Sequence, residues 1–187
     1  MSLNHAILGI VSRQPLTGYD LKKIMQDSAY MPWSGNNNQI YKALVELLER
    51  GYLTNEVQHQ DGAPSKKIYT ITEQGLLELK RWTLSEPEPP EFRKVLLVRL
   101  ASAEQLSDEE LGGLLSRYED ELNAQLAYQE EKHQRQTAAG ALPNGVREAL
   151  IQRMIHANVM SFYRQELSWV QELRAKLFEQ EEEKEGE

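Results

Sequence analysis

The chain has 187 residues, no cysteine and a formal net charge of −8. Without cysteine it cannot form a disulfide, a cysteine metal site or a cysteine nucleophile, and it suits a reducing compartment. No apolar run approaches the roughly 18 residues of a membrane span, and no basic start with an apolar core marks a secretion signal, so we expect a cytoplasmic protein.

The charge is distributed unevenly along the chain. Residues 1–84 hold nine Lys and Arg against eight Asp and Glu, a net charge of +1, whereas residues 85–187 hold twelve against twenty-one, a net charge of −9. A surface for nucleic acid therefore belongs to the first part, and we expect the acidic second part to have a different role.

Two short helices are predicted at the start of the chain. Apolar spacing favours a first helix over residues 3–12, and residues 14–16 (Gln-Pro-Leu) indicate a turn. Thr17 is expected to cap a second helix, because a threonine side chain can accept a hydrogen bond from an amide in the first helical turn. Tyr19 and Lys22 fall on or near the outer side of that helix.

The stretch from Asn36 to Gly51 predicts a third helix. Asn36 can cap its start, Gly51 can take the left-handed conformation that ends a helix, and apolar residues recur on one stripe between them. Pro32 in the preceding connector prevents a continuous helix. Trp33 beside it is interpreted as a core residue, with ligand stacking as the alternative.

The outer face of this third helix carries side chains that suit contact with DNA. Amides can form paired hydrogen bonds with adenine in the major groove, whereas lysine and tyrosine reach phosphate. A solvated helix face would show similar residue types, so this stretch alone leaves both interpretations open. The candidate DNA-contacting residues are Asn37, Asn38, Gln39, Tyr41 and Lys42.

A β-hairpin is predicted directly after this helix. Leu53 and Val57 have the even spacing that places them on one face of a strand, as do Tyr69 and Ile71 on the next strand. Residues 61–65 indicate the loop between the two strands. A helix followed by a basic hairpin is the order of a winged helix-turn-helix. The loop tip is expected to carry three further candidate DNA contacts: Ser65, Lys66 and Lys67.

A proline-rich segment, residues 86–91, divides the chain. It follows a helix predicted over residues 73–84, and three of its residues within four positions are prolines, which cannot lie in a helix interior. We therefore expect a DNA-binding domain over residues 1–85, a linker over residues 86–91 and a helical domain over residues 92–187.

Two long helices are predicted to dominate the second domain, after a short helix over residues 92–100. Ser107 and Glu110 form a capping box that opens the first long helix, which runs to about Thr137, and the last helix opens near Val146. Their apolar stripes are similar to a coiled-coil seam, so a second copy of the chain is the expected partner. The candidate dimerisation residues are Leu111, Leu115, Leu122, Leu150, Met154, Val159, Phe162, Val170 and Leu173.

The chain offers no residue set for catalysis. Its four histidines lack zinc-ligand spacing, no glycine-rich phosphate loop follows a strand, and no Gly-x-Ser-x-Gly elbow is present. We therefore predict no enzyme activity, no metal site and no cofactor.

Several short motifs of the first domain follow one another in a specific order. They are Ile7-Leu8-Gly9-Ile10, Gly18-Tyr19-Asp20-Leu21, Gln39-Ile40-Tyr41-x-Ala43-Leu44, Leu48-Glu49-x-Gly51, Pro64-x-x-Lys67-x-Tyr69-x-Ile71-Thr72-x-x-Gly75 and Leu79-x-x-Trp82. On these motifs, residues 3–84 resemble the PadR family of bacterial transcriptional regulators. The length of the chain resembles the long subgroup, which has a helical C-terminal dimerisation domain. The family commonly has proline where this chain has Lys42, a difference that is compatible with a helix.

The resemblance implies a mainly α fold with a small β-hairpin, in which a winged helix-turn-helix head precedes long C-terminal helices. It also implies a homodimer that binds a pseudo-palindromic operator in double-stranded DNA. Family members are generally repressors and the founding type responds to phenolic acids, so a small aromatic effector is a candidate, with no binding residues assigned. The alternative is a protein-interaction module or scaffold that does not bind DNA, which a measurement of affinity against salt would distinguish.

Overall fold

The computed structural model describes residues 3–30, 37–60, 63–90, 92–138 and 145–182. The chain divides into two units, Met1–Pro90 and Glu91–Glu187. Every helix within the described ranges is too short or too polar to span a membrane. The expected cap residue Asn36, the connector proline Pro32 and Trp33 lie outside these ranges.

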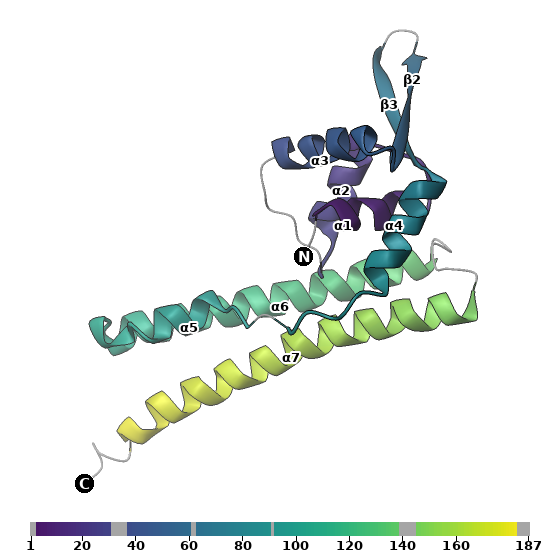
Figure 1. Ribbon diagram of the computed structural model, residues 1–187. Helices are drawn as coiled ribbons and strands as arrows, with labels where there is room; N and C mark the ends of the chain where they lie inside the picture. Colours follow the sequence, from purple (N-terminus) through teal and green to yellow (C-terminus); the bar gives the residue numbers. More distant parts are fainter. Residues whose placement is uncertain (1–2, 31–36, 61–62, 91, 139–144, 183–187) are drawn as a thin grey trace. The chain divides into compact units, whose positions relative to one another are not determined.

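The first unit combines helices with a small antiparallel sheet (Figure 1). Its elements are α1 (Leu3–Val11), β1 (Leu16–Thr17), α2 (Gly18–Asp27), α3 (Asn37–Glu49), β2 (Leu53–Gln60), β3 (Ala63–Ile71) and α4 (Glu73–Thr83). The strand order is β1-β3-β2, with Leu16 opposite Tyr69 and Leu53 opposite Ile71. The mainly α fold with a small β-hairpin is therefore confirmed.

One apolar core holds these elements together. Helix α3 contributes Ile40, Leu44 and Leu47, at the spacing that places residues on one helical face, and each of the three is at most 2% exposed. The other fully buried side chains of this core are Ile7, Leu8, Leu21, Met25 and Leu53. Because α3 is held by one face only, its opposite face lies in solvent.

The predicted start of α2 at Thr17 and the predicted end of α3 at Gly51 are confirmed. The backbone amide of Asp20 donates to Thr17 Oγ1 at 3.1 Å, and the Thr17 hydroxyl donates in turn to the Asp20 carboxylate at 2.6 Å. Gly51 has a φ of 69° and ends α3 in the left-handed conformation.

A second set of contacts ties the start of α4 to the end of α3. The Thr72 hydroxyl donates to the carbonyl of Gly51 at 2.7 Å and accepts from the amide of Gly75 at 3.0 Å. Gly75 allows a close approach, since a Cβ there would lie 2.2 Å from the carbonyl oxygen of Tyr52. These contacts hold the base of the hairpin at a defined position relative to α3.

The sheet differs from the prediction in two places. Leu16, expected in a turn, begins β1, which pairs with β3 at Ile68 and Tyr69. Strand β3 begins at Ala63, so the hairpin is longer than predicted and residues 65–67 lie within a strand rather than at the loop tip. Strand β1 pairs with β3 only at Ile68 and Tyr69, so one edge of β3 has no pairing strand at Pro64. A proline, which has no N–H to donate, is tolerated at such an edge.

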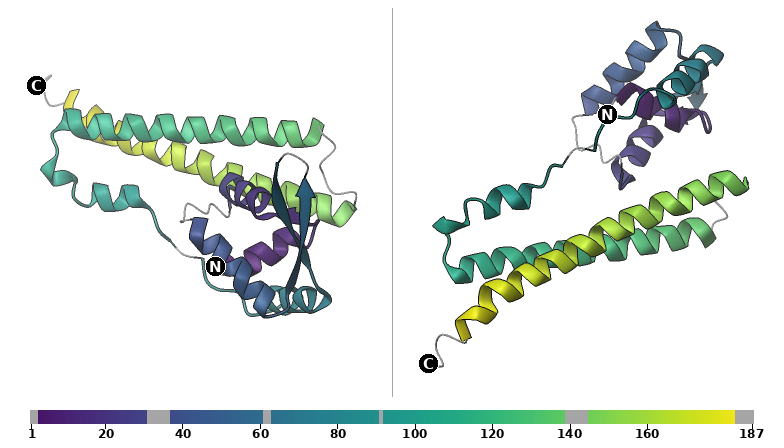
Figure 2. Two further views of the ribbon diagram at one scale, coloured as in Figure 1. Left: turned by 90° about the horizontal axis from the view of Figure 1, so that it is seen from above. Right: turned by 60° about the horizontal axis from the view of Figure 1, so that its bottom comes forward.

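The second unit is an antiparallel pair of long helices with a short helix before it (Figure 2). Its elements are α5 (Val95–Leu100), the 3-10 turn η1 (Ala103–Gln105), α6 (Asp108–Ala138) and α7 (Val146–Glu182). The predicted capping box opens α6: the amide of Glu110 donates to Ser107 Oγ at 3.2 Å, and the amide of Ser107 donates to Glu110 Oε2 at 2.9 Å. Helix α5 begins three residues later than predicted, at Val95.

A buried carboxylate joins all three helices of this unit. Glu166 on α7 is 3% exposed, and it accepts hydrogen bonds from the Lys94 ammonium and, at 3.0 Å, from the Tyr118 hydroxyl. Burial and the bond to Glu166 raise the pKa of Tyr118 to about 12. The Lys94 ammonium also lies over the Phe162 ring, 5.7 Å from its centroid. This ion pair attaches the start of α5 to the long helices.

Three of the nine predicted dimerisation residues are buried inside a single chain. Leu115, Leu122 and Val170 are at most 4% exposed, because with Leu96 they form the core between α5, α6 and α7. They have no surface to offer a partner, which corrects their expected role. Leu111, Val159 and Leu173 are half-buried, whereas three others are exposed: Leu150 at 47%, Met154 at 60% and Phe162 at 52%.

Candidate nucleic-acid interface

The outer face of α3 presents the side chains that are predicted to contact DNA. Asn38, Gln39, Tyr41 and Lys42 are all exposed, and Tyr41 retains 48% of its accessible surface. Asn37 is the first residue of the helix, and its side chain lies outside the described part of the structure. The face therefore offers two amides, a phenol and an ammonium group within the five consecutive positions 38–42.

Tyr41 brings the start of α2 close to this face. Its ring packs on Gly18, where a Cβ would lie 3.0 Å from Tyr41 Cε1, so a larger residue would displace the ring. Tyr19, the next residue, is 69% exposed, and Lys22 one turn later is half-buried. Helices α2 and α3 together form a surface with tyrosine and lysine beside the amides, which is the composition expected for phosphate contacts beside base contacts.

The hairpin presents its polar side chains on both faces. Lys66 is opposite Gln58 and Lys67 is opposite Val57 in the strand register. Successive side chains of a strand point to opposite faces, so the two lysines do not act as one pair. Ser65 shares the face of Lys67.

A further hydrogen bond, 3.0 Å between Ser65 Oγ and His59 Nδ1, crosses the hairpin. The bond joins β2 to β3 near the end of the hairpin, and it occupies a hydroxyl that we had expected to meet DNA.

Acidic residues limit how far along α3 a phosphate can approach. Glu49 is exposed in the last turn, and the carboxylate of Glu46 pairs with the Arg50 guanidinium at 2.6 Å. Since carboxylates repel phosphates, backbone contacts from α3 are restricted to its first half. A shallow hollow of about 420 Å³ runs along this face, and it is lined by Asn38, Tyr41, Lys42, Val45, Glu46 and Glu49.

Val45 is a further residue of this face, and it is not among the contacts predicted from the sequence. It is 53% exposed, although valine is an apolar side chain in the middle of a helix. The helical period could have found it, because five residues after Ile40 correspond to about 140° around the helix, well away from the buried stripe.

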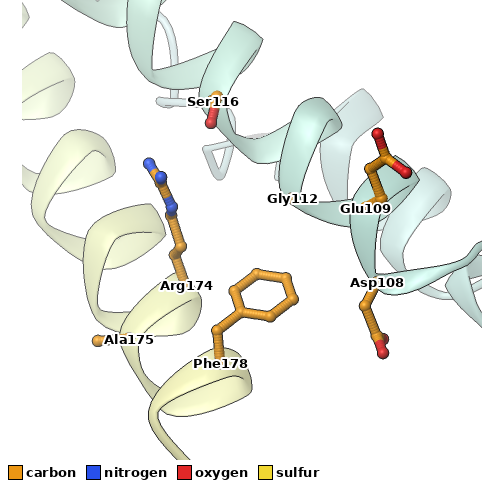
Figure 3. A pocket seen from close by; sticks show the side chains of 7 residues that line it. All are labelled: Asp108, Glu109, Gly112, Ser116, Arg174, Ala175 and Phe178. Atoms are coloured by element: carbon orange, nitrogen blue, oxygen red, sulfur yellow. The ribbon is translucent and has the colours of Figure 1, made fainter. Parts of the chain in front are cut away.

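A second hollow, of about 570 Å³, lies in the other unit between the start of α6 and the end of α7 (Figure 3). The ring of Phe178 faces Gly112 across it, and Arg174 on its wall pairs with Glu119 at 3.2 Å. Asp108 and Glu109 add two carboxylates to its lining. This charge opposes an anionic ligand, so the hollow does not match a phenolic acid.

The described residues contain no group of three or more histidine, aspartate and glutamate side chains that could hold a metal ion. The chemistry available to the α2, α3 and hairpin surface is hydrogen bonding and charge pairing. Such groups recognise a polyanion with base edges, which is what double-stranded DNA presents.

Two family models match the chain. The transcriptional regulator PadR-like family matches residues 7–81, and the family called Virulence activator alpha C-term matches residues 92–177. The negative transcriptional regulator PadR of Bacillus subtilis is 34% identical over 92 residues, which are 49% of this chain and 50% of that protein. The chain thus spans about half the length of the curated relatives it matches.

Solved structures are similar over nearly the whole chain. The smu.1604c protein of Streptococcus mutans is 27% identical, with a TM-score of 0.80 over 94% of this chain and 99% of that one. Bacillus subtilis PadR in complex with operator DNA is 23% identical, with a TM-score of 0.77 over 93% and 98%. The same protein in complex with p-coumaric acid has a TM-score of 0.72, at 23% identity and over 93% and 97% of the two chains.

Proposed function

We propose that the chain, whose residues 7–81 match the transcriptional regulator PadR-like family, is a cytoplasmic homodimer that represses transcription at a pseudo-palindromic operator. In this proposal α3 enters the major groove and the β2–β3 hairpin lies along the phosphate backbone. The observation that carries it is the outer face of α3, where amides, a tyrosine and a lysine are exposed on a helix whose other face is sealed in the core.

The first test is selection of DNA from a random or genomic pool, followed by sequencing of the retained fragments. We expect a pseudo-palindromic sequence, bound with an affinity that falls linearly in a log–log plot against salt, by a slope of about −0.9 for each phosphate contacted. If no sequence is enriched among the retained fragments and the affinity for DNA does not depend on salt, the alternative of a protein-interaction module is supported.

Asn38→Ala tests the assignment of α3 as the reading helix. If the amide pairs with a base, its loss reduces discrimination between operator and random DNA by about 1–3 kcal/mol. Asn123→Ala, which removes an exposed amide from α6, is the matched control and should leave both affinities unchanged. An equal drop on operator and random DNA would mean that Asn38 contacts the backbone.

The exposed apolar side chains of α7 support the homodimer. Leu150, Met154 and Phe162 keep about half of their surface in water within one chain. An exposed apolar patch of this kind is typical of a protein interface, and a second copy of the same helix offers the same side chains. We propose these three residues, rather than the buried Leu115, Leu122 and Val170, as dimer contacts.

A small aromatic effector is the finer part of the proposal. Its support is the similarity to a negative regulator and to a structure that contains p-coumaric acid. We expect p-coumaric acid, added to the protein–operator complex, to lower the affinity for DNA, as measured by fluorescence anisotropy with benzoic acid as the control. An unchanged affinity at saturating ligand would remove phenolic acids from the proposal and leave DNA binding intact.

A further inference from the structure

Val45 lies on the outer face of α3, the face that would lie against the base edges of the major groove in the proposed complex with DNA. It follows Asn38 by seven residues and Lys42 by three, and both spacings return to the same side of a helix. All three line the hollow on the outer face of α3. The core side of the helix is completed by other residues, with Ile40, Leu44 and Leu47 at most 2% exposed, so Val45 is not needed for packing.

The surroundings of Val45 restrict what it can contact. Glu49, one turn further along, is exposed, and the carboxylate of Glu46 beside it is engaged by Arg50 at 2.6 Å. Carboxylates keep phosphates away, so this part of α3 cannot lie along the DNA backbone. A base edge carries no formal charge and can be approached by such a surface.

Only one group on the base edges of the major groove is apolar. The C5-methyl of thymine lies there, and side-chain methyl groups recognise it by direct apolar contact. Cytosine, adenine and guanine present donors and acceptors that a valine side chain cannot satisfy. A β-branched valine is also stiff about its first torsion, so its two methyl groups are held in a defined position.

We propose that Val45 is a specificity residue that reads the methyl group of a thymine in the operator. The inference rests on the proposed DNA-binding function and goes beyond it by assigning one base-reading contact. Asn38 and Gln39 would read neighbouring bases by hydrogen bonds, and Val45 would contribute the apolar contact about two turns later along α3.

The test replaces single thymines of the selected operator by deoxyuridine, which removes the methyl group and leaves base pairing unchanged. We expect one thymine in each half-site at which the replacement weakens binding of the wild-type protein by about four-fold, the value of one buried methyl-sized group. Val45→Ala should bind the thymine and uracil duplexes equally and keep the wild-type salt dependence on random DNA. Leu77→Ala, which shortens an apolar side chain that is 63% exposed on α4, is the control and should retain the thymine preference.

The outcomes separate the inference from the function on which it rests. Operator binding with no thymine sensitive to uracil, or the same sensitivity in Val45→Ala as in wild type, overturns the role of Val45 while DNA binding stands. If no sequence is selected and random DNA binds without salt dependence, the proposed function and this inference fail together. Circular dichroism of Val45→Ala confirms that the variant is folded, as expected for an exposed site.

Discussion

The two lysines of the hairpin occupy different faces of one strand, and this gives them different expected roles. Lys66 and Lys67 are both exposed, and a hairpin that lies on the DNA backbone with one face brings only one of them to a phosphate. We predict that Lys66→Ala and Lys67→Ala have unequal effects. The more effective single variant should lower the salt slope by about one unit, since one phosphate contact is lost.

The readout is the affinity for operator and random DNA at several salt concentrations. Because phosphate carries no base identity, both affinities should fall by similar factors. The double variant should resemble the stronger single variant. Equal losses from the two single variants would show that the hairpin inserts between phosphates with both faces, and an unchanged slope in the double variant would exclude the hairpin from the interface.

A stacked histidine pair makes the stability of the second unit dependent on pH. His133 on α6 and His156 on α7 have parallel rings with centroids 4.0 Å apart. Burial lowers the pKa of His156, and positive charge on His133 and Arg164 lowers it further, while Glu130 opposes the shift. The folded state therefore binds fewer protons than the unfolded chain, and the free energy of unfolding falls as pH drops below about 6.5, the ordinary value of histidine.

We predict that the urea midpoint of the wild-type protein decreases between pH 7.5 and pH 5.5. His156→Phe keeps an aromatic ring against His133 but does not titrate, so its midpoint should change less over the same range. His59→Gln, which removes an exposed histidine of the hairpin, is the control and should follow the wild-type profile. A His156→Phe profile parallel to wild type would show that other groups cause the pH dependence.

The sequence predicted which side chains of α3 are exposed, because helix periodicity separates the buried and exposed faces of this helix. The sequence did not show which residues of β2 lie opposite Lys66 and Lys67. That register depends on where β2 and β3 begin to pair, which is at Gln60 and Ala63. Val45 was missed for a different reason. Candidate contacts on the outer face were chosen among polar and basic side chains, so an apolar valine was passed over although its angular position points outward.

At the scale of elements, the Lys94–Glu166 pair attaches the start of α5 to the long helices, next to the apolar cluster around Leu96. Lys94→Met would leave the Glu166 carboxylate buried with the Tyr118 hydroxyl alone. Since Lys94 is itself 24% exposed, we predict a loss of about 2–3 kcal/mol in the free energy of unfolding, below the usual cost for a fully buried pair.

The double variant Lys94→Met with Glu166→Met tests the cause. Replacing both partners by apolar side chains of similar length removes the uncompensated charge, so most of the lost stability should return. Lys176→Met breaks an exposed pair with Glu172 and should have little effect. A double variant as unstable as the single one would show that the loss comes from packing of the Lys94 stem.

Elements with strong local signals were predicted well, and elements that depend on distant partners were not. The caps at Thr17 and Ser107 are short sequence patterns whose hydrogen bonds close within three residues. Strand β1 is two residues long, too short to show alternation, and it exists because Tyr69, far along the chain, pairs with Leu16. No local sequence pattern indicates a pairing between residues so far apart in the chain.

At the scale of the whole molecule, the charge and the apolar surface are divided between the two units. The first unit has a complete core of its own, whereas α7 in the second unit leaves Leu150, Met154 and Phe162 exposed. The sequence predicted an intermolecular seam along both long helices. Part of that stripe is used within the chain, because Leu115 and Leu122 of α6 and Val170 of α7 are buried in one cluster with Leu96 of α5, and only the remaining part is available to a partner.

We therefore predict that dimerisation and DNA binding separate between the two units. Residues 1–90 alone should be folded and monomeric, and should bind DNA weakly, with little preference for a palindrome over a single half-site. Residues 91–187, with twelve basic and nineteen acidic residues, should form a helical dimer without affinity for DNA. In the full-length dimer two heads would contact half-sites about 34–36 Å apart or a multiple of that distance.

The physical reason is that the dimer makes the second contact intramolecular. Once one head is bound, the other is held at a high effective concentration near its half-site, so the full chain should bind a palindrome about 100-fold or more tightly than residues 1–90. Full-length Met154→Glu, which places a charge on the proposed dimer surface, should lose the same advantage. Glu substituted for the exposed Leu77 of α4 is the matched control and should leave the dimer intact. Sedimentation equilibrium of the two fragments and both variants measures their oligomeric state. A dimeric first unit or a monomeric second unit would place the dimer interface elsewhere.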